Sequence, residues 1–364
     1  MIRLLLFTLL PVIALLSCKA QDKPRSANTL DAFVLAKGDS ILKADKVPGI
    51  FIGVLNKGKR SFYQFGYADP ATKTVFDSST VFEIGSITKT FTAYVLETVL
   101  KEKNISDTAF ILPYLPDSVR SNKALGSIRF IHLLNHTSGL PRLPDNIDIR
   151  SKQPYENYTA DLLFTYLKKC TPRAPGKFEY SNLAFGLAGF LAASISQKTY
   201  ASLLNDHIFQ PFHLLKPGDN FETSGKKSQG YFGPDTASYW KFDVLAPAGA
   251  LKCNGNEILT YLQTVSDPPS FAAGIIDSLL APTFVIPPGS VMSVGRSWFI
   301  QKEDKQPVIY WHNGGTYGFS TYAGFIRGED KAVIIAINQF NKNAGADKLG
   351  RDILQFLTDQ AAGK

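Results

Sequence analysis

The chain has 364 residues, of which 45% are hydrophobic, so it can bury a large core in one domain or in two closely packed lobes. It carries 39 basic and 31 acidic residues, a formal net charge of +8. The lysines occur in pairs such as Lys168 and Lys169 and never in long basic runs. This distribution predicts a mildly basic, solvated surface and does not favour nucleic acid as a partner.

The first 28 residues predict export and lipid anchoring. A short charged start precedes an apolar run, Leu4–Leu16, which has signal-peptide length and is too short to span a bilayer as a mature helix. The run ends in Leu15-Leu16-Ser17-Cys18, which resembles a bacterial lipobox. The resemblance implies a signal peptide of residues 1–17, lipid on the Cys18 thiol, and a polar tether of residues 18–28. We therefore expect a lipid-anchored protein of the bacterial cell envelope that faces the periplasm or the outside, with simple secretion as the alternative.

Strand-like segments occur near both ends of the remaining chain. The spacing of apolar residues predicts a helix over Leu30–Ala44. Two strands, Ile50–Leu55 and Ser61–Phe65, are joined across Asn56-Lys57-Gly58-Lys59, which is typical of a hairpin. The later predicted strands are Ser297–Gln301, Val308–Trp311, Ser320–Ile326 and Lys331–Ile337, and the predicted closing helix is Asp347–Leu357.

The middle of the chain, from about Ile128 to Pro287, has helical spacing. Its predicted helices are Ile131–Leu134, Ala160–Lys169, Leu183–Ser196, Ala201–Phe209 and Asn256–Val265. Strands around a helical middle predict an α+β fold: an antiparallel sheet built from both termini, flanked by helices, with an inserted and mostly helical lobe. The predicted domain is 29–364, with a sheet lobe at about 29–82 and 296–364 and a helical lobe at about 83–295. We expect a site at the seam between the lobes.

The segment Glu83–Phe91 predicts the start of a helix that carries chemistry. The helix is apolar around most of its circumference and therefore belongs inside the protein. Its first turn nevertheless holds Ser86 and Lys89, three residues apart on one face. A buried lysine is costly without a partner, and a desolvated amine of lowered pKa can activate a neighbouring hydroxyl as a nucleophile. The bare pattern also fits an N-cap serine followed by a surface lysine.

A second segment, Pro175–Asn182, places Tyr180 and Asn182 just before an apolar helix. Tyrosine is a poor base at its usual pKa near 10. A neighbouring lysine ammonium would favour the phenolate, so that Tyr180 could take and return protons. Asn182 both donates and accepts hydrogen bonds, which suits holding Lys89 and a substrate amide together. Alone, the segment also fits a turn before a capped helix with a core tyrosine.

The third segment, Trp311–Phe319, follows a strand-like run and is rich in glycine. Its glycines let a ligand approach the backbone closely. An edge strand that ends in such a turn can offer N–H groups to a bound carbonyl. The alternative is a hairpin turn with an incidental His312.

Taken in order, Ser86-x-x-Lys89, Tyr180-x-Asn182 and His312-x-Gly314 resemble the serine β-lactamase and penicillin-binding-protein-like hydrolases. Within them, the chain resembles the branch of class C β-lactamases, D,D-carboxypeptidases, D-aminopeptidases and related esterases. The likeness runs from about Pro48 to Asn338. The supporting segments are Val81–Ser86, His132–Pro141 and Pro247–Leu251.

The resemblance implies a role for each motif residue. Ser86 is the expected nucleophile, and Lys89 and Tyr180 share its proton. The backbone N–H groups of Ser86 and Gly315 form the expected oxyanion hole, and His132 and His136 are structural. The expected substrate-binding residues are Asn182, His312, Asn313, Gly314 and Gly315.

One departure bears on the substrate. Class C β-lactamases carry Lys-Thr-Gly where this chain has His312-Asn313-Gly314. A histidine is mostly neutral at pH 7, so the third motif resembles that of the peptidases and esterases. Specificity is expected from the loops Asp145–Tyr158 and Phe221–Tyr239.

The leading hypothesis is an envelope serine hydrolase that acts through a Ser86 acyl-enzyme on a D-amino-acid peptide, an amide or a small ester. A β-lactamase is the alternative, and a non-catalytic penicillin- or peptidoglycan-binding sensor lipoprotein is the second alternative. No metal or cofactor is expected. The expected partners are a small-molecule or peptide substrate (a peptidoglycan-like peptide, an ester or a β-lactam) and a membrane. Cys170 and Cys253 either pair in an oxidising envelope or stay apart as buried thiols.

Overall fold

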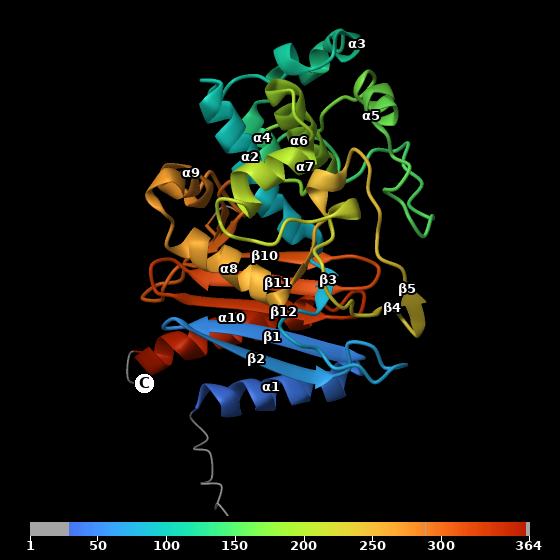
Figure 1. Cartoon of the computed structure of the whole chain (residues 1–364). Coiled ribbons are helices and arrows are strands. Elements are labelled where there is room, and N and C mark those ends of the chain that lie inside the picture. The colour runs from blue at the N-terminus through green and yellow to red at the C-terminus, as the bar shows by residue number, and fades with distance from the viewer. Residues whose placement is uncertain (1–28, 288, 362–364) are drawn as a thin grey trace, which may run out of the picture.

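A large antiparallel sheet and a helical lobe form the protein in the computed structural model, which describes residues 29–287 and 289–361 (Figure 1). The α+β fold predicted from the sequence is confirmed. The predicted signal peptide, the lipidated Cys18 and the tether lie outside the described residues. Within the described ranges, no helix combines the length and the apolar composition needed to cross a membrane.

The main sheet has eight strands in the described part of the chain, in the order β2-β1-β12-β11-β10-β9-β8-β7. All neighbouring strands are antiparallel. The strands are β1 (Gly49–Asn56), β2 (Lys59–Gly66), β7 (Phe284–Val285), β8 (Met292–Val294), β9 (Phe299–Gln301), β10 (Ile309–Gly315), β11 (Ser320–Ile326) and β12 (Lys331–Ile337). Two short sheets pair β3 (Val81–Glu83) with β6 (Lys252–Asn254) and β4 (Gly230–Phe232) with β5 (Asp235–Ala237).

Helices surround this sheet and fill the inserted lobe. The α-helices are α1 (Leu30–Asp45), α2 (Thr88–Glu102), α3 (Asp117–Arg120), α4 (Phe130–Leu134), α5 (Ala160–Leu167), α6 (Asn182–Ser196), α7 (Tyr200–Leu204), α8 (Gly255–Ser266), α9 (Ser270–Leu280) and α10 (Asn343–Ala361). Short turns of other helical types are η1 (Gly85–Ile87), η2 (Leu112–Tyr114), η3 (Lys123–Ser127), η4 (Asn205–Phe209), η5 (Asp219–Phe221) and η6 (Ala246–Ala248).

The central strands are apolar on both faces because helices cover both. On β1, Ile50 and Ile52 pack toward α1 and α10, whereas Phe51 belongs to the larger core beneath the helical lobe. Successive side chains of a strand point to opposite faces, so the continuous apolar sequence of β1 and β12 follows from double coverage. Figure 1 shows α8 in front of β10–β12 and α10 emerging from behind the strands, with α1 below β2 and the helical lobe above β10.

The helix α2 crosses the middle of the helical lobe and is buried on nearly every side. The ring of Phe91 stacks on that of Tyr261 in α8, with centroids 3.8 Å apart. Lys89, in the first turn of α2, has no exposed surface. The predicted burial of this helix and its lysine is therefore present in the structure.

Three features differ from the sequence expectation. The strand predicted to end at Trp311 continues to Gly315, so the third motif lies in β10 and only its last residues form a turn. The sheet also gains β7 and β8, which precede residue 296, and the helix α9 had no predicted counterpart. These strands are two and three residues long, too short for a clear alternation of apolar and polar residues.

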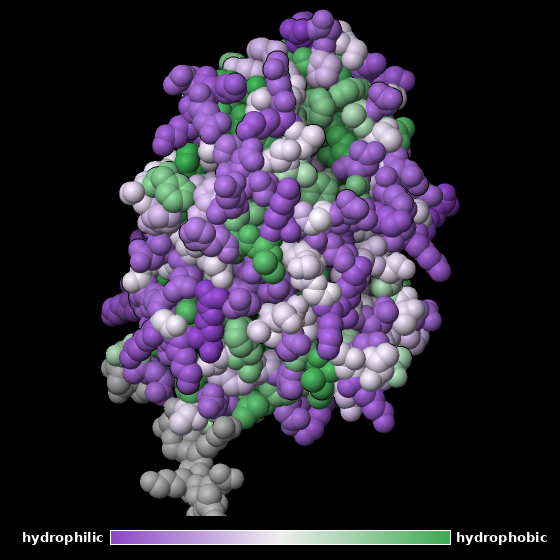
Figure 2. Space-filling view, viewed as in Figure 1, coloured by the Kyte–Doolittle hydropathy of each residue, from purple (hydrophilic) through white to green (hydrophobic). Residues whose placement is uncertain are grey.

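The surface and the cysteines are consistent with a solvated globular domain. Figure 2 shows hydrophilic side chains over most of the visible face, with small and separate apolar patches. Cys170 and Cys253 are buried and free, so the two thiols do not pair in this structure.

Candidate active site

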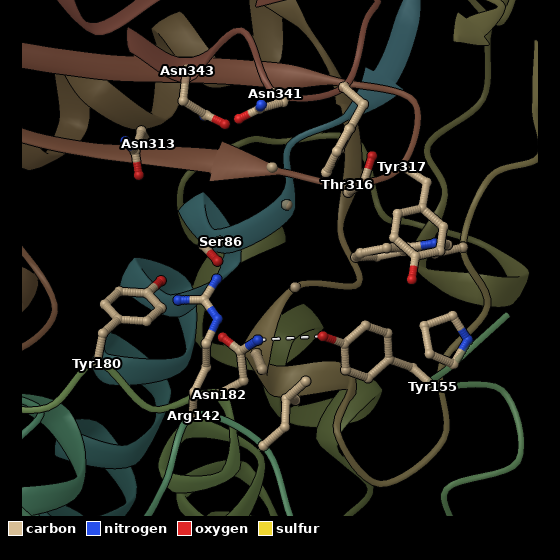
Figure 3. Close-up of a pocket in the computed structure, with 18 of the residues that line it drawn as sticks. Ser86, Arg142, Tyr155, Tyr180, Asn182, Asn313, Thr316, Tyr317, Asn341 and Asn343 are labelled. Carbon is tan, nitrogen blue, oxygen red and sulfur yellow. Dashed lines mark hydrogen bonds between the residues drawn. The ribbon is translucent and has the colours of Figure 1, made fainter. Parts of the chain in front are cut away.

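A cavity of about 570 Å³ lies where β10 meets the helical lobe (Figure 3). The nucleophile candidate Ser86 lines it, together with Tyr180 and Asn182 from the helical lobe. Asn313 and Gly315 line it from β10. The fold thus brings together residues of all three sequence motifs around one space.

Ser86 lies in the short turn η1, which leads directly into α2. Gly85 before it has a φ of +50°, and a Cβ at that position would lie 2.8 Å from the backbone nitrogen of Gly315. Only glycine accepts this backbone conformation with so close a neighbour. The turn therefore sets Ser86 beside the end of β10, where the backbone N–H groups of Ser86 and Gly315 are the candidates for an oxyanion hole.

Lys89 is the immediate partner of Ser86. Its Nζ donates to Ser86 Oγ at 2.9 Å and to the carbonyl oxygen of Ala248 at 2.6 Å. Burial, and after it the charge of Arg142, lowers the pKa of Lys89 well below its usual 10.5. A neutral amine keeps one N–H for the carbonyl and offers its lone pair to the Ser86 proton, so Lys89 is suited to act as the general base.

Tyr180 stands on the other side of this pair. Its ring centroid is 5.0 Å from Lys89 Nζ, and its hydroxyl points toward Ser86 in Figure 3. Burial raises the pKa of Tyr180, although the nearby Ser86 hydroxyl and the charge of Arg142 oppose that rise. Tyr180 is therefore a phenol in the resting enzyme. The sequence had suggested that a Lys89 ammonium favours the phenolate of Tyr180. That argument does not apply, because the lowered pKa of Lys89 makes it a neutral amine.

Asn182 begins α6, where the side chain of Ser181 caps the helix by accepting from Ala184 N at 2.9 Å. The Nδ2 of Asn182 donates to the hydroxyl of Tyr155 at 3.3 Å, and this bond is drawn as a dashed line in Figure 3. Its Oδ1 has no hydrogen-bond partner among the described residues. The expected bond between Asn182 and Lys89 is absent from the described contacts. The free acceptor at the cavity wall suits a substrate N–H.

The end of β10 forms the opposite wall. β9 pairs with only the first residues of β10, Ile309–Trp311, so the edge from His312 to Gly315 is not covered by that strand. A Cβ on Gly314 would lie 1.9 Å from the carbonyl oxygen of Ile84. The glycine is therefore required for η1 to pack against β10, which explains part of the third motif.

Two predicted substrate-binding residues, His312 and Gly314, do not line the cavity, and His312 is the one with a side chain that could have contacted substrate. Its imidazole is fully buried, with Nδ1 2.6 Å from the carbonyl oxygen of Asn313 and Nε2 without a partner among the described residues. Burial lowers the pKa of His312 to about 3. The group is neutral at physiological pH and supplies no cation to the cavity.

The histidines of the connecting segment lie behind the site. The ring of His136 is 4.2 Å from that of Tyr180, and its Nδ1 accepts from the backbone N–H of Ser181 at 3.1 Å. Burial lowers the pKa of His136 well below 6.5. This neutral imidazole supports the backbone that carries Tyr180 and Asn182. His132 accepts the Arg129 backbone N–H at the start of α4.

Sequence reasoning missed an aromatic wall of the cavity. Tyr155 packs against Phe242 at 4.6 Å and Trp240 at 5.1 Å between ring centroids, and Trp240 contacts Tyr317 at 4.8 Å. Tyr155 lies in the first loop named as a specificity candidate, whereas no residue of Phe221–Tyr239 lines the cavity. Aromatic residues are common in cores, so their number in the sequence gave no signal of this wall.

A row of amides forms the rim beyond β10. Asn313 Nδ2 donates to Asp347 Oδ2 at 2.8 Å, and Asn343 Nδ2 donates to the carbonyl oxygen of Gly314 at 2.7 Å. Asn341 lines the same side.

Arg142, which directly follows the His-Thr-Ser-Gly-Leu-Pro segment, lines the helical side of the cavity and was also missed by the sequence reasoning. In the residues that the structure describes, no group of three or more His, Cys, Asp or Glu is placed to hold a metal ion.

Comparisons with known proteins agree with this geometry. The β-lactamase family model matches residues 36–358. A β-lactamase of Yersinia enterocolitica is 26% identical over 87% of this chain and 89% of its own length. A β-lactamase of Providencia stuartii is 24% identical over 82% and 84%.

Solved structures share the fold. A class C β-lactamase from Rhodobacter sphaeroides superposes with a TM-score of 0.75 at 22% identity, covering 89% of this chain and 99% of that one. A β-lactamase/D-alanine carboxypeptidase from Pseudomonas syringae superposes with a TM-score of 0.75 at 22% identity, covering 90% and 98%. The fold, the assembled serine–lysine–tyrosine site and the family match lead to one conclusion: the chain belongs to the β-lactamase family and is a serine hydrolase.

Proposed function

We propose that the protein hydrolyses small esters, or amides and peptides of D-amino acids, through an acyl-enzyme on Ser86. The observation that carries this proposal is the hydrogen bond of 2.9 Å between Ser86 Oγ and the fully buried amine of Lys89. A buried amine of lowered pKa in contact with a hydroxyl is what an activated serine requires.

The geometry supports a reaction in two halves. Lys89 accepts the Ser86 proton as Oγ attacks the substrate carbonyl, and the oxyanion receives the N–H groups of Ser86 and Gly315. Tyr180, a phenol whose hydroxyl points toward Ser86 in Figure 3, donates its proton to the leaving group and recovers one through Lys89. In the second half the same pair takes a proton from water as its oxygen attacks the acyl carbon, and returns a proton to Ser86 Oγ as the acyl–Oγ bond breaks.

A β-lactamase is the second candidate, because the relatives at 24–26% identity are β-lactamases. The neutral and buried His312 favours the peptidase or esterase activity. A substrate with a carboxylate near β10 would find only the amides of Asn313, Asn341 and Asn343 there. A sensor without activity is disfavoured because a binding protein needs neither the lowered pKa of Lys89 nor its contact with Ser86.

Labelling and turnover test the proposal together. A fluorophosphonate or penicillin probe should add mass to the peptide that contains Ser86, and Ser86→Ala should abolish the label. Turnover is then measured on D-amino-acid amides, muropeptides, p-nitrophenyl esters and nitrocefin. Labelling that persists in Ser86→Ala would refute the nucleophile. A kcat/KM for nitrocefin far above those for the esters and amides would favour the β-lactamase.

We also propose that Cys18 anchors the protein in the envelope. The support is the apolar run and the lipobox-like Leu15-Leu16-Ser17-Cys18 of the sequence. Wild-type protein should partition into the detergent phase of a Triton X-114 extraction, and Cys18→Ser should move it into the aqueous phase or leave it uncleaved. Wild-type protein in the aqueous phase would contradict the anchor.

A further inference from the structure

Arg142 is the sole charged residue among the described residues that line the active-site cavity. It follows the connecting segment and lies on the helical side of the cavity, across from β10. In Figure 3 its guanidinium lies between Tyr180 and Asn182, directly below Ser86. The side chain is exposed at the mouth of the cavity, so a bound substrate can reach it.

The guanidinium has no anionic partner of its own in the described chain. No carboxylate of a described residue lies within ion-pair distance of it, and no described group accepts a hydrogen bond from its N–H donors. The Tyr180 ring lies beside it, with its centroid 5.2 Å from the guanidinium carbon. Stacking occupies a face of the guanidinium and leaves its edge of N–H donors free for a carboxylate or phosphate.

The other cavity groups leave this charge uncompensated. The opposite wall presents neutral amides, and His312 behind it is neutral because burial lowers its pKa to about 3. Tyr180 is a phenol, since burial raises its pKa. A cleft that presents one sign of charge attracts a ligand of the other sign.

We propose that the substrate of this hydrolase carries a carboxylate or a similar small anion, which Arg142 binds from the helical side of the cavity. The inference rests on the proposed hydrolase function and names its substrate class. The cation of the site thus lies on the wall opposite the third motif. In the third motif itself, the position of the lysine of class C β-lactamases is occupied by His312. The anion belongs to the acyl part or to the leaving group of the substrate. Either part can reach Arg142, because its guanidinium lies directly below Ser86 in Figure 3.

Two matched ester pairs test the proposal. For the acyl part, 4-nitrophenyl hydrogen adipate is compared with its methyl ester. For the leaving group, 4-acetoxybenzoate is compared with methyl 4-acetoxybenzoate. The measured quantity is the ratio of kcat/KM for the acid to kcat/KM for the ester, because a general loss of activity cancels in it. In at least one pair, Arg142→Gln should lower the ratio by about tenfold, and Arg142→Lys should keep it within about threefold, as a charge-assisted contact would require.

A matched control is available eight residues further along the chain. Arg150 is exposed, does not line the cavity, and lies 3.9 Å from Asp148. Arg150→Gln removes the same charge and should leave the ratio unchanged. If Arg142→Gln lowers the rates of acid and ester equally in both pairs, Arg142 acts only on the Lys89 and Tyr180 protons, and the proposal is wrong.

Binding separates this inference from the proposed function. In Ser86→Ala, the tryptophan fluorescence that includes cavity-lining Trp240 reports binding of adipic acid monomethyl ester and adipic acid dimethyl ester without turnover. The acid should bind more tightly, and adding Arg142→Gln should remove that preference. If the wild type turns over no substrate but this preference is present, the hydrolase proposal fails and the anion site stands. If turnover occurs without any preference in rate or binding, the anion site fails alone.

Discussion

Glu83 joins the segment that carries Ser86 to two walls of the active-site cavity, and its ionisation should be visible in protein stability. Its side chain is 2% exposed. Oε1 accepts from the backbone N–H of Trp240 at 2.6 Å, and Oε2 accepts from Thr316 Oγ1 at 2.6 Å. Burial raises the pKa of Glu83 from 4.5 to about 7, although these two bonds and the charge of Lys252 oppose the rise.

This raised pKa has a defined effect on stability. Between pH 4.5 and about 7 the folded protein keeps a proton on Glu83 that the unfolded chain has lost. The contribution of Glu83 to the free energy of unfolding is therefore largest below the unfolded pKa, falls as pH rises to about 7, and is constant above it. The total fall is about 3 kcal/mol, because each pKa unit corresponds to about 1.36 kcal/mol.

The variant Glu83→Gln removes the titration and keeps the shape. The amide oxygen can accept from Trp240 N, and the amide nitrogen can donate to Thr316 Oγ1, because a hydroxyl also accepts. Urea unfolding of both proteins at about pH 5 and about pH 7.5 should show the wild type losing roughly 2 kcal/mol relative to the variant, because part of the total fall lies below pH 5. Buried Glu97, with a pKa of about 7, and Asp347, with a pKa of about 6, are present in both proteins and cancel in the difference.

The control variant is Glu303→Gln, since Glu303 is exposed and its carboxylate accepts a hydrogen bond from Gln301 Nε2 at 2.6 Å. Its stability should follow that of the wild type at both pH values. Parallel pH profiles for the wild type and Glu83→Gln would refute the reasoning and would mean that Lys252, opposite Glu83 in the β3–β6 pair, keeps the carboxylate ionised.

Three further predictions concern the site itself. Lys89→Met should slow acylation of Ser86 by about 10²–10⁴-fold, measured as the burst phase with a p-nitrophenyl ester, because the general base is lost; a burst rate close to that of the wild type would contradict it. His312→Lys should lower the free energy of unfolding in urea by about 3–5 kcal/mol, since it places an unpaired ammonium in a fully buried site, and a stable variant with faster nitrocefin turnover would overturn this. Tyr155→Phe should raise KM for D-amino-acid amides more than it lowers kcat, because Asn182 Nδ2 loses its partner at 3.3 Å; an unchanged KM would show that this bond does not orient the substrate contact.

Local sequence determined the secondary structure and the register of the motifs to a large extent. The predicted strands Ser320–Ile326 and Lys331–Ile337 have the bounds found for β11 and β12, because long apolar runs between turn residues leave few alternatives. The spacing of Ser86 and Lys89 placed both on one face at the start of a buried helix, and their side chains are hydrogen-bonded in the structure. Residues three apart on a helical turn meet whatever the rest of the chain does.

Tertiary structure alone decided the partners and the charge states. Lys89 donates to the carbonyl oxygen of Ala248, 159 residues away, where the sequence had suggested Asn182. His312 belongs to a motif expected to contact substrate, yet its side chain points into the core from β10. Burial then lowers the pKa of the imidazole, so the group is neutral. Arg142 carries no distinguishing pattern and enters the site only because its segment packs beside Tyr180. Distances between remote segments, and the loss of water around each group, depend on how the whole chain packs, and no local pattern of residues encodes either.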